Sequence, residues 1–345
     1  MKSNIYGKTL SELKDIVVKL KLPGYTSVQL IDWLYKKNAG SIEQMSNLSK
    51  ETRIILSENF TLTKSSPVNV QVSEDGTKKY LFAAGEKNFI ETVVIPEKNR
   101  NTLCISSQVG CSMGCIFCMT GKQGFQGNLS SGEIINQISS LPERDLISNI
   151  VFMGMGEPLA NTENVIKSTE IMTSDYGFGW SASRITISTI GILPGLEKVI
   201  QETHCHLAVS LHSPFEDERL YLMPVEKLFP LTRVIDFLKK SQLKRQRRVS
   251  FEYIMFKDLN DTLRHVNGLT RLLNGLKCRI NLIRFHEIPG VPLQSSSDET
   301  ILRFKNRLND KGILTTIRAS RGQDIFAACG MLSTRFNRGN QQIHI

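Results

Sequence analysis

Long apolar runs are missing from this chain of 345 residues. No stretch of about 18 apolar residues occurs, so the sequence predicts no membrane-spanning helix. The opening residues, MKSNIYGKTL, include a lysine but no apolar segment after it, so we expect no secretory signal peptide. Internal repeats and low-complexity tracts are also missing. The length instead suits a barrel-type domain with a smaller companion domain.

A regular, even set of cysteines is missing as well. The seven cysteines are an odd number at irregular spacings, which argues against a disulfide framework and favours a reducing, cytoplasmic environment. Acidic residues are outnumbered, with 33 Asp and Glu against 43 Lys and Arg, which gives a net charge of +10. Such a surplus favours a polyanionic partner, RNA or DNA ahead of an acidic membrane, although solubility alone would also account for it.

Three regions follow from the periodicity of apolar residues. Residues 1–66 repeat apolar side chains three and four apart and predict a small helical module. Residues 67–100 read as short strands separated by Asp-Gly and Gly-Glu-Lys-Asn turns, and predict an antiparallel β-hairpin connector. Residues 101–345 alternate strands and helices, which predicts an α/β domain with a parallel sheet, either open or curled into a partial (β/α)6 barrel.

Six strands and five helices are expected in that last region. The strand candidates are TLCISS, SNIVFMG, RITIST, CHLAVSLH, RVSFEYIMF and RINLIRF. The helix candidates are SSGEIINQISS, NTENVIKSTEIMT, LPGLEKVIQET, LTRVIDFLKKSQL and TLRHVNGLTRLLNGL. Loops at the carboxyl ends of the strands should hold the chemistry.

Two basic segments leave alternatives open. The helical module, with Trp33 and Tyr35 in the segment WLYKK, could be a packing domain or an RNA contact. The charge run from Lys239 to Arg248, KKSQLKRQRR, could be a solvated edge or a phosphate contact.

The segment CSMGCIFC places Cys111, Cys115 and Cys118 within one short loop. Such a loop lets three thiolates bind three irons of a cubane cluster and leaves the fourth iron open. The amino and carboxylate groups of S-adenosylmethionine can chelate that iron, and reduction then yields a 5'-deoxyadenosyl radical. Phe117 would shield the cluster. A structural zinc site would need a fourth ligand, and no His or Cys follows within the next several residues.

The segment from Arg100 to Phe125 resembles the signature of the RlmN/Cfr family of radical S-adenosylmethionine enzymes, which methylate adenosine in RNA. The segments MGMGEPLAN, TISTIG, SLHSP, NLIRF and AACG occur in the family's order, and the similarity covers most of the chain. The resemblance implies a 4Fe–4S cluster and S-adenosylmethionine as cofactors. It also implies 23S ribosomal RNA and some transfer RNAs as substrates, a reduced flavodoxin-type electron donor and a monomer.

Further cofactor contacts are implied by the same resemblance. On bare sequence the loop MGMGEP could be a tight turn or a ligand-binding loop, and the resemblance places Gly156 and Glu157 beside S-adenosylmethionine. A lone histidine beside a strand is more often a packing residue, yet the family places His212 at the cofactor. The implied contacts are Gly156, Glu157, Ser188, Ser210, Leu211, His212 and His286.

The resemblance also assigns three catalytic residues. Cys329 would take a methyl group from one S-adenosylmethionine, and the radical made from a second would activate that methyl group for addition to adenine. Cys104 would then resolve the protein–RNA adduct through a transient Cys104–Cys329 disulfide. Glu91 matches the family's proton acceptor, although Cys104 could also move the proton. On sequence alone each cysteine would be a buried apolar residue and Glu91 a surface carboxylate.

Five positions depart from the family pattern. Gly127 stands where Arg is common, His286 where Asn contacts the cofactor, and Glu226 where Asn is usual. Phe326 and Met331 replace polar residues that flank Cys329. These changes keep every cysteine, so they affect the substrate more than the type of reaction.

The segment IPEKNRNTLCISSQVGCSMGC favours methylation of adenine carbon 2 over carbon 8, the reaction of the antibiotic-resistance subgroup. In the favoured interpretation RNA lies across the barrel mouth and the target base is flipped into the site. Two rivals stay open. One is a non-catalytic iron–sulfur RNA-binding protein, and the other is a radical enzyme that acts on a small molecule or peptide.

Overall fold

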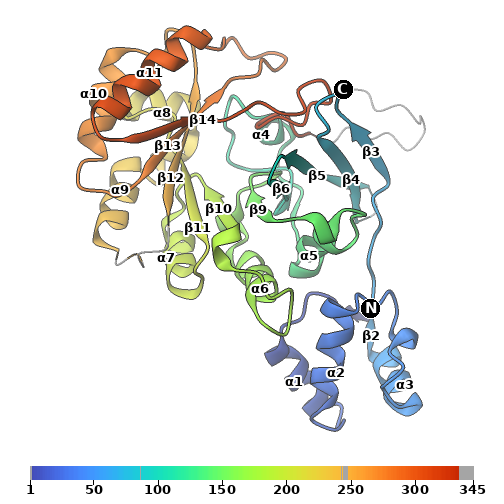
Figure 1. The fold of residues 1–345 in the computed structure, drawn as a ribbon. Helices are drawn as coiled ribbons and strands as arrows, with labels where there is room; N and C mark the ends of the chain where they lie inside the picture. The colour runs from blue at the N-terminus through green and yellow to red at the C-terminus, as the bar shows by residue number, and fades with distance from the viewer. Residues whose placement is uncertain (1, 86, 242, 244–247, 334–345) are drawn as a thin grey trace.

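The computed structural model describes residues 2–85, 87–241, 243 and 248–333 (Figure 1). Most of the basic run between Lys239 and Arg248 therefore lies outside the described residues, and neither interpretation of it is tested.

A ten-stranded sheet forms the body, in the order β14-β13-β12-β11-β10-β9-β6-β5-β4-β3. From β14 to β6 neighbouring strands are parallel, whereas β5, β4 and β3 continue the sheet in antiparallel fashion. All six predicted strands are present, and β14 adds a seventh parallel strand that was not predicted. The strands are β3 (Asn69–Val72), β4 (Lys78–Ala84), β5 (Asn88–Glu97), β6 (Arg100–Cys104), β9 (Asn149–Phe152), β10 (Ile185–Thr189), β11 (His206–Ser210), β12 (Val249–Met255), β13 (Arg279–Arg284) and β14 (Leu314–Ile317).

The segment expected as a connector, residues 67–100, thus supplies three strands to the same sheet as the barrel strands. A separate short pair, β7 (Gln108–Val109) and β8 (Gly127–Asn128), lies next to β6 in sequence. Within the described residues the sheet stays open, because β3 and β14 are its two edges. The predicted partial barrel is confirmed.

Helices cover the outer face of the parallel strands (Figure 1). The five predicted helices are α5, α6, α7, α9 and α10, while α4, α8 and α11 were not predicted. None of the helices in the described residues is long and apolar enough to cross a membrane. Their bounds are α4 (Met119–Gln123), α5 (Ser131–Ser139), α6 (Thr162–Thr173), α7 (Leu193–Glu202), α8 (Glu216–Leu222), α9 (Leu231–Lys240), α10 (Leu263–Leu272) and α11 (Asp298–Asp310), with 3₁₀ turns at Arg144–Leu146, Pro158–Ala160, Ala182–Arg184 and Pro224–Lys227.

The amino-terminal module is helical, as predicted. Its first helix starts at a capping box, in which Thr9 accepts a hydrogen bond from the Glu12 N–H and Glu12 accepts one from the Thr9 N–H. The parallel strands β1 and β2 tie the start of the module to its end. Its elements are β1 (Ser3–Asn4), α1 (Leu10–Lys19), α2 (Thr26–Ile31), a π-helical turn (Asp32–Lys36), a 3₁₀ turn (Ile42–Gln44), α3 (Lys50–Asn59) and β2 (Phe60–Thr61).

Polar contacts fix this module to the body. The Tyr6 hydroxyl and the Ser139 hydroxyl on α5 are 2.5 Å apart, and Asn38 donates to the Ser139 carbonyl at 3.1 Å. Lys167 on α6 forms an ion pair with Glu12 at 2.7 Å. The module is therefore packed against α5 and α6.

Strand register decides which side chains face the hollow of the sheet. Cys104 on β6 is opposite Val151 on β9, Val151 is opposite Thr186 on β10, and Thr186 is opposite His206 on β11. Val151, Thr186 and His206 all line one interior cavity. Because residues opposite one another project to the same face, Cys104 also projects toward the interior.

Candidate active site

The three clustered cysteines lie on one loop between β7 and α4. The Cys111 sulfur accepts hydrogen bonds from the backbone N–H groups of Met113 and Glu157, and the Cys118 sulfur accepts similar bonds from the next turn. Cys115 interacts electrostatically with both of the other thiols. Backbone donors aimed at sulfur are a feature of sites that hold iron–sulfur clusters.

Burial raises the pKa of all three thiols, to about 12 for Cys111. Thiolates form in such a place when a metal supplies the compensating positive charge. Among the described residues, no three His, Cys, Asp or Glu side chains gather as the ligands of a single metal ion would. Three thiols on one loop, with N–H donors directed at the sulfurs of Cys111 and Cys118, therefore fit the ligands of a 4Fe–4S cluster.

An apolar wall backs this loop. Phe117 is buried and packs edge-on against the His212 ring, with ring centroids 4.8 Å apart, and against Phe256 at 5.7 Å. Leu222 and Met223 belong to the same apolar cluster. Phe117 therefore places apolar surface behind the cysteine loop, and its shielding of a cluster stays a prediction.

The loop MGMGEP follows β9 and comes close to the segment after β6. A Cβ atom on Gly154 would lie 2.7 Å from the Ile105 carbonyl carbon. A Cβ atom on Gly156, whose φ is +92°, would lie 2.4 Å from the Gln108 Cβ. Both positions need glycine for close backbone packing, which supports the turn interpretation without testing the cofactor contact.

Glu157 is a buried hub at this turn. One carboxylate oxygen accepts hydrogen bonds from the Thr189 hydroxyl at 2.6 Å and the Leu159 N–H at 3.0 Å, and the other accepts from the Ile190 N–H at 3.0 Å. Burial raises the pKa of this carboxyl to about 7. Glu157 thus joins the turn after β9 to the carboxyl end of β10, where the predicted cofactor contact Ser188 lies.

Ser188 and Ser210 occupy the ends of β10 and β11. Ser188 is opposite Ala208, and Ser210 is opposite Glu252, so both serines share the interior face with the cavity-lining Glu252. Both serines are half-buried. Leu211, predicted as a cofactor contact, is fully buried and its N–H donates to the Glu252 carbonyl.

His212 is held in the left-handed region at φ +56°, which is uncommon for a residue other than glycine. Its Nδ1 accepts a hydrogen bond from the Ile254 N–H at 3.0 Å, and its carbonyl accepts one from Asn260 at 2.7 Å. Burial, with the nearby Arg219 charge, lowers its pKa to about 3. In the structure His212 is a neutral packing residue behind Phe117.

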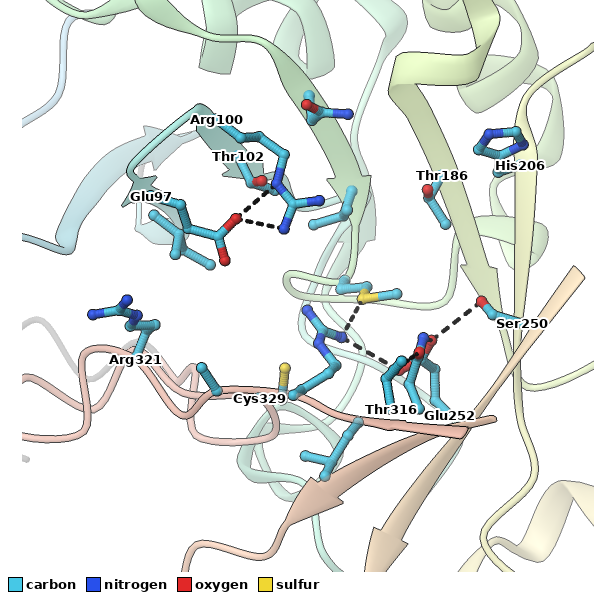
Figure 2. A pocket seen from close by; sticks show the side chains of 18 of the residues that line it. Glu97, Arg100, Thr102, Thr186, His206, Ser250, Glu252, Thr316, Arg321 and Cys329 are labelled. Atoms are coloured by element: carbon cyan, nitrogen blue, oxygen red, sulfur yellow. Dashed lines mark hydrogen bonds and ion pairs between the residues drawn. The ribbon is translucent and has the colours of Figure 1, made fainter. Parts of the chain in front are cut away.

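An interior cavity of about 510 Å³ reaches Cys329. Cys329 follows β14, is half-buried, and points into the cavity from the side opposite the Glu97–Arg100 ion pair (Figure 2). His286 lines the same cavity, and burial lowers its pKa. His286 therefore lies near Cys329, at the position where the family has an asparagine.

The structure brings Cys104 and Cys329 close enough for their charges to interact. Burial raises the pKa of Cys104 to about 12, and its sulfur accepts a hydrogen bond from the Met153 N–H. Arg318 interacts with both thiols and donates to the Met153 sulfur at 3.0 Å and to Glu252 at 3.4 Å. Sequence reasoning missed Arg318, because it follows the one parallel strand that was not predicted.

Glu91 on β5 faces the segment that carries Cys329. Its carboxylate forms an ion pair with Lys79 at 3.1 Å and accepts a hydrogen bond from the Ser333 N–H at 3.0 Å. Both side chains of the pair are buried, and burial raises the pKa of Glu91. Lys79 was also missed, although its alternation with Leu81 in KKYLFAA places it on one face of a strand.

The departures from the family pattern have distinct settings. Gly127 pairs with Val109 in the short β7–β8 ladder. Glu226 forms a fully buried ion pair with Arg219. Phe326 has a φ of +52° and Met331 is buried, so both shape the segment around Cys329.

Two family models match the chain. Residues 105–266 match the Radical SAM superfamily, and residues 3–62 match the ribosomal RNA large subunit methyltransferase N-terminal domain. The second match falls within residues 1–66, the helical module predicted from periodicity.

Full-length relatives agree with these matches. A protein of Parabacteroides distasonis named "Probable dual-specificity RNA methyltransferase RlmN" is 54% identical over 97% of this chain and 98% of its own length. The "Dual-specificity RNA methyltransferase RlmN" of Syntrophus aciditrophicus is 43% identical over 96% of each chain. The crystal structure of a radical SAM methyltransferase from Sphaerobacter thermophilus superposes with a TM-score of 0.88 at 37% identity, and the match covers 96% of this chain and 99% of that one.

Proposed function

Because this chain belongs to the RlmN family of radical S-adenosylmethionine RNA methyltransferases, we propose that it methylates carbon 2 of an adenosine in 23S ribosomal RNA and in some transfer RNAs. The approach of Cys104 and Cys329, which lie far apart in the sequence, carries this proposal. Two thiols that can meet beside an iron–sulfur loop suit a reaction that needs one sulfur to carry carbon and another to release it.

The cofactors fit residues present in the chain. Cys111, Cys115 and Cys118 would hold a 4Fe–4S cluster, and the interior ends of β10 and β11, with Ser188 and Ser210, would hold S-adenosylmethionine. When bound, these groups supply a hydrogen-abstracting 5'-deoxyadenosyl radical. The apolar wall around Phe117 would keep water from that radical.

Cys329 would accept the methyl group. Its thiolate would attack the methyl carbon of S-adenosylmethionine, forming a thioether as S-adenosylhomocysteine leaves with the electron pair of the broken bond, and that carbon would later join carbon 2 of adenine. Arg318 interacts electrostatically with Cys329, which places a positive charge beside the sulfur that would make that attack.

Cys104 would release the product. Its thiolate attacks the Cys329 sulfur, the S–S bond forms as the S–C bond breaks, and the carbon keeps the electron pair and takes a proton to become the methyl group. Glu91 is proposed as the acceptor of the carbon 2 proton by resemblance. Its contacts with Lys79 and Ser333 also support a positioning role for the segment that carries Cys329.

Nucleoside mass spectrometry tests the proposal. RNA from a deletion strain should lack methyladenosine at the target positions, the wild-type gene should restore 2-methyladenosine, and Cys329→Ala should not. If 8-methyladenosine were restored instead, the carbon 8 alternative would hold. If Cys329→Ala restored the modified base, the role of Cys329 would be wrong. A cytoplasmic location, a monomeric state and a flavodoxin-type electron donor remain predictions.

A further inference from the structure

On β10, β11 and β12 the cavity that reaches Cys329 lies against the amino halves of the strands, while beside β13 and β14 its lining continues past their carboxyl ends to His286 and Arg318. Its described lining residues on β10, β11 and β12 include Thr186, His206 and Ser250, which lie at or near the starts of those strands. Ser188 and Ser210, two positions or more further along, are not among them. Along β10, β11 and β12 the space next to Cys329 therefore extends toward the amino ends of the strands.

The carboxyl end of the barrel is covered. The Met119 N–H donates to the Gly330 carbonyl at 2.8 Å, and the Thr120 hydroxyl donates to the Leu332 carbonyl at 2.7 Å. These bonds join the cluster loop to the segment that carries Cys329, over the apolar cluster that contains Phe117. An apolar cover of this kind does not suit a charged sugar–phosphate chain.

Three arginines line the cavity at its amino-terminal opening. Arg184 directly precedes β10, Arg248 directly precedes β12, and Arg279 is the first residue of β13. We call these three residues the arginine rim. Arg184 and Arg248 are exposed, and Arg279 is half-buried.

The charges of the arginine rim are not neutralised by acidic side chains. Among the described residues, none of its three members forms an ion pair with a carboxylate, whereas Arg100 at the same cavity is paired with Glu97. Although Arg248 Nε donates to His206 Nε2 at 3.3 Å, guanidinium groups without a carboxylate partner create a local positive potential. Their planar donor forks suit phosphate oxygens.

We propose that the arginine rim binds the phosphates that flank the target nucleotide of a single-stranded RNA segment, so that the adenine enters through the amino-terminal opening. This inference rests on the proposed function. RNA and S-adenosylmethionine then approach from opposite ends of the barrel and meet at Cys329. A flipped base is presented with its phosphates outside the pocket, which matches charges at the opening and a polar cavity beyond it.

The helical module continues this surface. The loop between α6 and β10, which ends at Arg184, contains Phe178, whose ring packs edge-on against Tyr35 of the module at 6.3 Å. Figure 1 shows the module beneath α5 and α6. A bound RNA that contacts the arginine rim is therefore flanked by the module.

Salt-dependent RNA binding tests the proposal. The double variant Arg184→Gln/Arg279→Gln is compared with Arg271→Gln/Arg307→Gln, which removes the same charge from exposed positions on α10 and α11. The probe is an RNA hairpin with an unpaired adenosine in its loop, followed by fluorescence anisotropy from 50 to about 300 mM salt. Two lost single-strand phosphate contacts should reduce the slope of log K against log salt by about 1.4, and weaken binding roughly ten-fold at low salt.

The control variant should keep the wild-type slope and affinity. Unchanged iron content and melting temperature show that each variant is folded. If the rim variant binds with the wild-type slope and affinity, the assignment of the opening is overturned. If the wild-type protein itself binds the hairpin without salt dependence, the proposed RNA substrate fails, and that result is distinct from failure of the rim.

Discussion

The Glu91 carboxylate on β5 accepts a hydrogen bond from the Ser333 N–H at 3.0 Å, four residues beyond Cys329. The same carboxylate neutralises the buried Lys79 at 3.1 Å. A carboxylate that holds the segment after Cys329 in this way has a structural role that is separable from any proton transfer. Removing one member of such a pair leaves the other as an unpaired buried charge.

Glu91→Gln should destabilise the protein by about 3 kcal/mol, because Lys79 loses its counter-charge. The double variant Glu91→Gln/Lys79→Met removes both charges and should recover much of that loss. Thermal melting measures stability, and RNA methylation is followed in parallel. Activity that returns with stability in the double variant would mean that Glu91 positions the Cys329 segment. A stable but inactive double variant would mean that its carboxylate takes part in the chemistry.

Glu226→Asn, which introduces the residue usual in the family, should cost about 3–5 kcal/mol of stability. Arg219 is fully buried and would be left without its carboxylate partner, although carbonyls of Ser210 and Ile190 still accept from it. Glu299→Asn is the control, since its ion pair with Arg303 on α11 is exposed, and it should change stability by less than about 1 kcal/mol. Equal melting temperatures for the two variants would show that the buried ion pair contributes no more to stability than the exposed one.

Lowering the pH should destabilise the wild-type protein more than it destabilises the His212→Asn variant. The pKa of His212 is about 3 in the folded chain and near 6.5 when unfolded, because burial and Arg219 disfavour its protonation. Below pH 6.5 the unfolded state therefore binds a proton that the folded state does not bind. The free energy of unfolding falls by about 1.4 kcal/mol for each pH unit between pH 6.5 and pH 3. Asparagine tolerates the left-handed backbone and does not titrate.

The measurement is denaturant unfolding of both proteins at several values between pH 7 and pH 5. If the free energy of unfolding depends on pH in the same way in both proteins, His212 is not a neutral, buried residue.

Cys104→Ala should trap RNA on the protein, because no thiol remains to break the bond between Cys329 and the product carbon. Cells that express this variant should yield an RNase-sensitive, higher-mass form on a denaturing gel. Cys205→Ala is the matched control, since Cys205 is equally buried but carries no predicted role. Free protein from the Cys104 variant, with normal methylation of RNA, would exclude the resolving role.

Sequence reasoning located the clustered cysteines, Cys104, Cys329 and Glu91, because motifs keep their spacing whatever surrounds them. It also found the parallel strands, whose apolar runs are long. It missed β14, whose residues LTTI are short and half polar, and with it Arg318. It could not foresee that Glu226 pairs with Arg219, because that contact depends on how α8 and the following 3₁₀ turn fold together.

The hairpin of β3 and β4, which precedes the barrel in sequence, also forms hydrogen bonds with the last described segment of the chain. Ser73 donates to Asp324 at 2.6 Å, and the Gly322 N–H donates to Asp75 at 2.9 Å. Contacts that span 251 and 247 residues of the sequence therefore hold the segment that carries Cys329, the proposed methyl acceptor.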